Sequence, residues 1–218
     1  MCGRFLLRSA PESWPADLLS LMETIPSEFS EPSSPSDLFR SRQNIAPTQN
    51  VLAIVQAAPV SHARLTSLRW GLVPPWAKDI KIGSSMINAR GETVDEKPSF
   101  RSAFLKQRCL IPADGYYEWV KLDDRKQPML IERPNSQLFC FAGLWEQNQS
   151  LTTCTIITTA ATDAMSAIHD RMPVVVNPED YVRWLDPTFR ERDWLKQRLT
   201  AAEDGYFKTS PVERVSGE

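Results

Sequence analysis

Glycine is scarce in this sequence. Only eight of the 218 residues are glycine, and they form no Gly-rich stretch. Phosphate-binding loops and the G-x-S-x-G nucleophile turn both need closely spaced glycines, because the backbone there adopts conformations that other residues resist. Their absence argues against nucleotide hydrolysis and against an α/β-hydrolase.

Residues that bind metal ions are also few. The chain has four cysteines without C-x-x-C spacing (Cys2, Cys109, Cys140 and Cys154) and only two histidines, His62 and His169. A structural zinc site needs four such ligands at suitable spacing. We therefore expect no metal, no organic cofactor and four free thiols.

An excess of one charge and a long apolar run are missing too. The net charge is −2 and the pI is about 5.8, so no strong basic field favours non-specific nucleic-acid binding. No apolar run approaches the roughly 18 to 20 residues of a membrane span, and the first residues lack the apolar core of a signal peptide. We expect a cytoplasmic protein with no membrane partner, whose contacts with any nucleic acid are local.

The order of short apolar runs predicts an α+β chain without βαβ repeats. Runs of β-branched and aromatic residues predict strands at 51–55, 65–70, 109–119, 128–132, 138–144 and 153–158, after a first strand near the amino terminus. Apolar spacing and capping signals predict helices at 10–23, 99–107, 163–168, 178–185 and 190–201, with Asn177 capping the fourth. A Pro- and Ser-rich stretch at 24–40 predicts a surface loop.

Cys2 follows the initiator methionine directly, and cysteine is small enough for Met1 to be removed. The mature chain would then begin with an α-amine and a thiol on one residue. An α-amine has a pKa near 8, so an appreciable fraction of it is neutral at physiological pH and able to attack an aldehyde. The tethered thiol can then close a five-membered thiazolidine ring. Position alone leaves open that Cys2 is an ordinary residue of a free terminus.

Four further segments accompany Cys2-Gly3-Arg4-Phe5 in order along the chain: Asn44-Ile45-Ala46-Pro47, Ile87-Asn88-Ala89-Arg90-Gly91-Glu92, Gly115-Tyr116-Tyr117-Glu118-Trp119 and His169-Asp170-Arg171-Met172-Pro173. Each sets a polar residue among small, aromatic or proline residues, as expected where a turn is held rigid for a site. Together, from Cys2 to about Val215, they resemble the SOS-response-associated peptidase (SRAP) family, whose members shield abasic sites in DNA by covalent crosslinking.

The resemblance implies a fold. We expect one domain over residues 1–218, in which a mostly antiparallel sheet curls into a barrel-like core with peripheral helices.

The resemblance also assigns catalytic roles to four residues. Cys2 would form the thiazolidine with the ring-opened sugar, and Asn88 would position its amine, as suits an uncharged amide with donor and acceptor atoms. Glu118, partly desolvated by its aromatic neighbours, would shuttle protons, and His169 would assist proton transfer and crosslink reversal. Taken singly, each also fits a structural role: a turn asparagine, an exposed glutamate or a capping histidine.

DNA contacts follow from the same resemblance. Arg4, Arg90 and Arg171 each lie within two residues of a proposed catalytic position, where guanidinium groups suit phosphates. Pairing with acidic neighbours such as Glu92 is the alternative for these arginines. The resemblance further assigns Asn44 and Thr159 to the DNA backbone, and Trp70 and Trp76 offer stacking surfaces unless they belong to the core. The expected partner is single-stranded DNA with an abasic site, also near a duplex junction, bound by a monomer that associates with the nucleoid.

Two other functions stay open at this point. Cys2 could serve a peptidase that removes its own Met1 or acts on other proteins, with His169 or Glu118 as the base. Alternatively, the arginines and tryptophans could recognise damaged single strands without any covalent bond. A complex dissociated by high salt would identify the second alternative, because screening weakens only non-covalent contacts.

Overall fold

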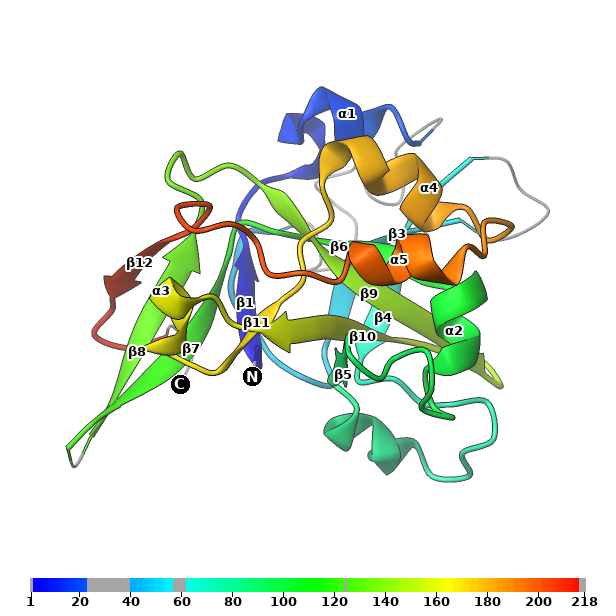
Figure 1. Ribbon diagram of the computed structural model, residues 1–218, viewed down its shortest axis with the longest axis horizontal. Helices are drawn as coiled ribbons and strands as arrows, with labels where there is room; N and C mark the ends of the chain where they lie inside the picture. The colour runs from blue at the N-terminus through cyan, green and yellow to red at the C-terminus, as the bar shows by residue number, and fades with distance from the viewer. Residues whose placement is uncertain (1, 23–39, 57–61, 124, 216–218) are drawn as a thin grey trace.

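The computed structural model describes residues 2–22, 40–56, 62–123 and 125–215 (Figure 1). The strands are β1 (Arg4–Leu7), β2 (Arg42–Ile45), β3 (Asn50–Val55), β4 (Arg64–Trp70), β5 (Asn88–Arg90), β6 (Arg108–Ala113), β7 (Gly115–Leu122), β8 (Arg125–Glu132), β9 (Phe139–Asn148), β10 (Leu151–Ala160), β11 (Arg171–Pro173) and β12 (Lys208–Pro211). The α-helices are α1 (Ala16–Leu19), α2 (Arg101–Lys106), α3 (Asp163–Ser166), α4 (Tyr181–Leu185) and α5 (Arg192–Gln197), and 3-10 turns cover Pro11–Ser13, Ile80–Ser85 and Pro178–Asp180.

Five strands form a closed barrel. They follow one another in the order β10, β4, β3, β6 and β9, and β9 pairs back onto β10, which closes the ring. Apart from the parallel pair β4–β10, the ring is antiparallel. Beyond the ring, the end of β10 is flanked by β5 and β11. The predicted barrel-like core of mostly antiparallel strands is confirmed.

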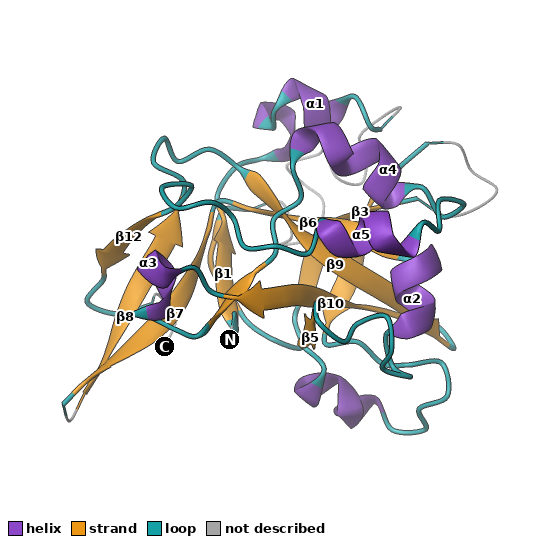
Figure 2. Cartoon of the chain, in the orientation of Figure 1, coloured by secondary structure: helices purple, strands orange, loops and turns teal. Residues whose placement is uncertain are grey.

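A second sheet packs beside the barrel. Its strand order is β12, β8, β7, β1 and β2, and all of its pairings are antiparallel. The helices lie at the periphery of the two sheets (Figure 2), as predicted. Phe5 of β1 contacts both Trp70 and Phe141 of the barrel edge-on, with ring centroids 5.3 and 5.7 Å apart, so one buried cluster joins the two sheets.

The predicted strand at 109–119 is in fact two strands that belong to different sheets. Asp114 separates β6 from β7 and turns the chain from the barrel into the second sheet. Its buried carboxylate accepts hydrogen bonds from the Arg8 and Ser9 amides and from Ser9 Oγ. A buried carboxylate is costly unless it is hydrogen-bonded in this way, so these bonds fix the corner.

The amino-terminal helix is shorter than predicted. Over the described part of this range, 10–22, the chain forms a 3-10 turn, an extended Trp14 and then the single turn of α1. Pro15 explains the interruption, because a residue that precedes proline is pushed out of the helical region. Trp14, Leu18 and Met22 are nevertheless buried, as the apolar spacing indicated.

Asn177 takes the predicted cap position before Pro178, but its side chain makes no capping hydrogen bond. The other predicted helices lie within their predicted ranges, each shorter by a few residues. The predicted loop at 24–40 falls, except for residue 40, outside the described residues.

Candidate active site

Cys2 lies at the seam between the barrel and the second sheet. It precedes β1, is completely buried, and its thiol is free, as are those of the other three cysteines. Asn88 of β5 donates a hydrogen bond from Nδ2 to the Cys2 carbonyl oxygen at 2.9 Å. Since β5 pairs with β10 and Cys2 leads into β1, this bond joins the amino terminus to the barrel side of the seam.

Glu118 reaches the same place from β7. It is 5 % exposed, and it shares a face of the strand with Tyr116, because side chains alternate along β-structure. Burial and the Glu118 charge raise the pKa of the Cys2 thiol, and burial and the charges of Cys2 and Glu118 raise that of the Tyr116 phenol. Cys2, Tyr116 and Glu118 are therefore electrostatic neighbours.

The aromatic surroundings of Glu118 differ from the sequence-based expectation. Tyr116 shares its face of β7, but Tyr117 and Trp119 point to the other face and pack with Leu6 and Val215 in a separate cluster. The predicted desolvation of Glu118 is thus produced by the seam of the two sheets rather than by both flanking aromatics.

Asn88 Oδ1 and the Tyr116 hydroxyl are buried at the seam and have no hydrogen-bond partner among the described residues. Buried polar groups in folded proteins are nearly always paired, so an unpaired acceptor and an unpaired donor beside a thiol are consistent with a site that awaits a ligand. Tyr116 was not among the residues predicted for the site. The two-residue spacing between Tyr116 and Glu118 is the signal that could have identified it.

The state of the thiol determines which chemistry the site supports. With its pKa raised well above the ordinary value, Cys2 is a neutral thiol near pH 7. A neutral thiol is a poor nucleophile compared with a thiolate. The buried thiol is therefore not an activated nucleophile in this arrangement.

His169 lies between α3 and β11, close to solvent. Its Nδ1 accepts a hydrogen bond from the Arg171 amide at 3.0 Å and also lies 2.7 Å from Asp170 Oδ1. These two contacts require opposite protonation of Nδ1. The Arg171 amide is fixed by β11, whereas the Asp170 side chain is 86 % exposed.

The three arginines differ in how they are held. Arg171 is mostly buried and binds Glu92 through two hydrogen bonds of 2.6 and 2.9 Å, the acidic pairing that the sequence left open. Arg4 donates to the Gly3 carbonyl and is partly buried, and Arg90 at the end of β5 is exposed. Arg90 pairs with Thr158 of β10, and Arg171 pairs with Ala160 of the same strand, so both backbones are held by β10. The Arg171 guanidinium also donates a hydrogen bond to the Thr158 carbonyl at 2.7 Å.

The two tryptophans have different environments. Trp70 is fully buried and donates its indole N–H to the Ile87 carbonyl, so it is a core residue and offers no surface for a base. Trp76 is 59 % exposed, in a segment whose carbonyls at Pro74 and Ala77 accept hydrogen bonds from Asn148 Nδ2. Only Trp76 of the pair therefore presents an anchored aromatic surface.

The remaining predicted DNA contacts, Asn44 and Thr159, are recessed. Asn44 is partly buried in β2, and its Oδ1 has no partner in the described part of the chain. Thr159 of β10 is buried opposite Met172 of β11.

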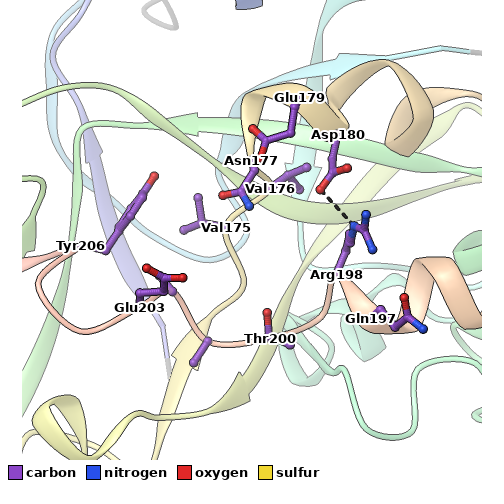
Figure 3. A pocket seen from close by; sticks show the side chains of 12 residues that line it. Val175, Val176, Asn177, Glu179, Asp180, Gln197, Arg198, Thr200, Glu203 and Tyr206 are labelled. Atoms are coloured by element: carbon purple, nitrogen blue, oxygen red, sulfur yellow. Dashed lines mark hydrogen bonds and ion pairs between the residues drawn. The ribbon is translucent and has the colours of Figure 1, made fainter.

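A cavity of about 550 Å³ lies elsewhere, between the segments 175–180 and 197–206 (Figure 3). None of the predicted site residues lines it. Its charged lining is mainly acidic, with Glu179, Asp180 and Glu203, and Arg198 is bound to Asp180 at 3.1 Å. An acidic lining repels phosphates, so this cavity is unsuited to a nucleic-acid backbone.

Within the described ranges, no cluster of three or more His, Cys, Asp or Glu side chains could hold a metal ion. No helix in the described part of the chain is long and apolar enough to cross a membrane.

Comparison with known proteins gives consistent matches. The family described as "SOS response associated peptidase (SRAP)" matches residues 1–217. The abasic site processing protein YoqW of Bacillus subtilis is 45 % identical over 206 residues, which cover 91 % of this chain and 86 % of YoqW. The abasic site processing protein YedK of Escherichia coli is 30 % identical over 232 residues, covering 100 % of this chain and 94 % of YedK.

Solved structures support the fold. A protein from Bacteroides thetaiotaomicron superimposes with a TM-score of 0.80 at 21 % identity, covering 97 % of this chain and 92 % of that one. A phage-related protein from Bordetella bronchiseptica gives a TM-score of 0.72 at 28 % identity, covering 98 % and 95 %.

Proposed function

Because this chain belongs to the SOS response associated peptidase (SRAP) family, we propose that it processes abasic sites in DNA by bonding covalently to them through Cys2. The observation that carries the proposal is the placement of Cys2, buried at the seam with its carbonyl held by Asn88 and its thiol beside Glu118. The names of the relatives supply the substrate, an abasic site, whose ring-opened sugar carries an aldehyde.

The chemistry balances in three steps. After Met1 has been removed, the Cys2 amine adds to the aldehyde carbon to give a carbinolamine. Loss of water leaves an imine, and addition of the thiol across the C=N bond closes the thiazolidine, with the thiol proton ending on nitrogen. While Met1 is attached, the nitrogen of Cys2 is an amide and the first step cannot occur. The neutral thiol of the resting site fits this order, since sulfur acts last.

Three side chains would assist these steps. Asn88 holds the Cys2 backbone, and its second amide atom, Oδ1, is available to orient the amine. Glu118 is the buried carboxylate that can take the proton from the adding amine and return it to the departing water. His169 would act at the solvent side, where reversal needs water.

DNA contact would rely on local groups, because the chain as a whole is slightly acidic. Arg4, Arg90 and Arg171 would contact the phosphates that flank the lesion, and Arg171 would exchange its bond with Glu92 for a phosphate oxygen. Trp76 would stack on a neighbouring base. We propose single-stranded DNA, also near a junction with duplex, as the partner of a monomer that works at the nucleoid.

The family description itself motivates a second candidate, a peptidase that releases its own Met1. The raised pKa of the Cys2 thiol weighs against Cys2 as a resting peptidase nucleophile, since such enzymes depend on a thiolate. Turnover of a peptide substrate with burst kinetics would favour this candidate over crosslinking.

The test is denaturing gel electrophoresis with intact-mass analysis after incubation with abasic-site single-stranded DNA. The protein must first be shown by mass to begin at Cys2. We expect an adduct with the summed mass of protein and DNA minus one water. Undamaged DNA should give none.

Cys2→Ala separates the two nucleophiles, because it keeps an α-amine and loses the thiol. It should give an adduct only when borohydride reduces the imine. No adduct from wild-type protein that begins at Cys2 overturns the proposal, and a complex dissociated by salt would then indicate a non-covalent binding module.

A further inference from the structure

We propose that the Tyr116 hydroxyl is a catalytic hydrogen-bond donor that binds the oxygen of the incoming aldehyde and of the carbinolamine formed from it. The inference rests on the proposed function and names a participant that the sequence motifs did not assign. It follows from the position of the hydroxyl, from its lack of a partner, and from the donors and acceptors that surround it.

The position of Tyr116 follows from strand geometry. Tyr116 and Glu118 are two residues apart on β7, so their side chains leave the same face of the strand. Tyr116 pairs with Phe5 of β1, three residues after Cys2. The phenol is therefore on the face of the second sheet that meets the barrel, where the Cys2 thiol also lies.

The phenol ring is rigidly held. Phe141 and Phe207 contact it edge-on, with ring centroids 6.1 and 5.6 Å away, and Tyr116 is 1 % exposed. A side chain fixed by aromatic packing loses no further rotamer freedom when it binds a ligand. Its hydroxyl is thus pre-organised rather than recruited during the reaction.

The hydroxyl itself has no hydrogen-bond partner within the described ranges. A phenol buried only for packing would lose nothing as phenylalanine, whereas a buried unpaired hydroxyl costs free energy that a bound acceptor recovers. Burial and the charges of Cys2 and Glu118 raise the pKa of Tyr116 well above its ordinary value, so the group keeps its proton and can donate at physiological pH.

Tyr116 adds a donor that the side-chain amide of Asn88 does not supply. Asn88 Nδ2 already donates to the Cys2 carbonyl, and Asn88 Oδ1 can only accept. Arg4 pairs with Tyr117, on the opposite face of the sheet from Tyr116. An aldehyde oxygen gains negative charge when the amine adds, and a fixed donor in a dry site stabilises that charge. Tyr116 keeps its own proton throughout.

The test compares Tyr116→Phe with Tyr117→Phe, because the control removes a hydroxyl from the next residue on the opposite face of the strand. Single-turnover crosslinking to abasic-site single-stranded DNA should slow by roughly 10- to 100-fold in Tyr116→Phe and stay within about twofold of wild type in Tyr117→Phe. Affinity for DNA with a tetrahydrofuran analogue, which has no aldehyde, should not change in either variant.

A second variant keeps the test decisive if Tyr116→Phe folds poorly. Site-specific 3-fluorotyrosine at position 116 retains the ring and the hydroxyl, and it should restore crosslinking to within a few-fold of wild type. Wild-type rates in a well-folded Tyr116→Phe protein overturn this inference and leave the proposed function intact. Absence of any wild-type adduct overturns both.

Discussion

The side-chain amide of Asn88 donates a 2.9 Å hydrogen bond to the backbone carbonyl of Cys2, across 86 positions of sequence. The bond fixes the backbone of the residue that we propose as the nucleophile, while leaving Oδ1 of the same amide without a partner in the described part of the chain.

Replacing Asn88 with alanine should therefore slow crosslinking more than it destabilises the fold. Loss of one hydrogen bond should cost about 1 kcal/mol of stability, whereas misplacement of the amine should slow capture by about 10- to 100-fold. Urea denaturation and single-turnover crosslinking measure the two effects. Asn88→Asp keeps the size of the side chain but loses the donor, so it should be as slow as the alanine variant. Fast crosslinking by either variant would contradict the positioning role.

Glu118→Gln should abolish most of the proton transfer while preserving the shape of the side chain. General acid–base catalysis by a positioned group contributes roughly 10²- to 10⁴-fold, so crosslinking should slow within that range. The matched control is Glu146→Gln, which neutralises another buried glutamate, located on β9 of the barrel. Equal rates in the two variants would show that Glu118 has no special part in the chemistry.

Substituting each of the two tryptophans with alanine should show that one contributes to DNA binding and the other to the stability of the fold. Trp76→Ala should weaken binding to single-stranded DNA by about 1–3 kcal/mol and leave stability within about 0.5 kcal/mol, because the ring is exposed. Trp70→Ala should lower stability by about 3–5 kcal/mol, because the ring is fully buried and its N–H is hydrogen-bonded. Fluorescence anisotropy and thermal unfolding provide the measurements. A destabilised Trp76→Ala protein would contradict the proposed surface role.

Glu146 should make stability depend on pH near neutrality. Burial raises its pKa to about 6, above the value near 4.3 expected in the unfolded chain. The folded state then binds the proton more tightly, so this contribution to stability is present at low pH and is lost as pH rises through about 6. Allowing for partial solvent screening, the loss should be about 1 kcal/mol.

Urea denaturation of wild type and Glu146→Gln at pH 5 and pH 7.5 would measure this effect, since the amide cannot titrate. The wild type should lose stability relative to the variant on going to the higher pH. Parallel behaviour of the two proteins would exclude the effect.

Local pattern predicted the strands of the barrel well, because they are runs of β-branched and aromatic residues long enough to show periodicity, whereas the barrel itself was implied by the family resemblance. It could not predict β5 or β11, which have three residues each and exist because β10 supplies their hydrogen-bond partners. It also missed the corner at Asp114, although Asp114-Gly115 is a turn signal inside the predicted run, because apolar residues continue on both sides of it. That information lies in Arg8 and Ser9, more than a hundred residues away.

In the site, too, some features could be predicted from local sequence and others are set by tertiary contacts. Five short motifs indicated Cys2, Asn88 and Glu118 through a family resemblance, and the structure brings these three together. The sequence could not decide whether Arg171 contacts DNA or pairs with Glu92, or whether Trp70 stacks on a base or belongs to the core. Both outcomes depend on tertiary contacts. Tyr116 was overlooked because its ring fits a core residue equally well, and only its unpaired hydroxyl distinguishes it.

The strand pairings also set the order in which the protein can become active during its synthesis. Cys2 is among the first residues to leave the ribosome, yet β1 pairs with β7 and Asn88 lies opposite Ile156. No nascent chain shorter than about three quarters of the full length can therefore hold Cys2 between Asn88 and Glu118. A growing chain therefore carries Cys2 from the start, but Cys2, Asn88 and Glu118 come together only after most of the chain has been synthesised.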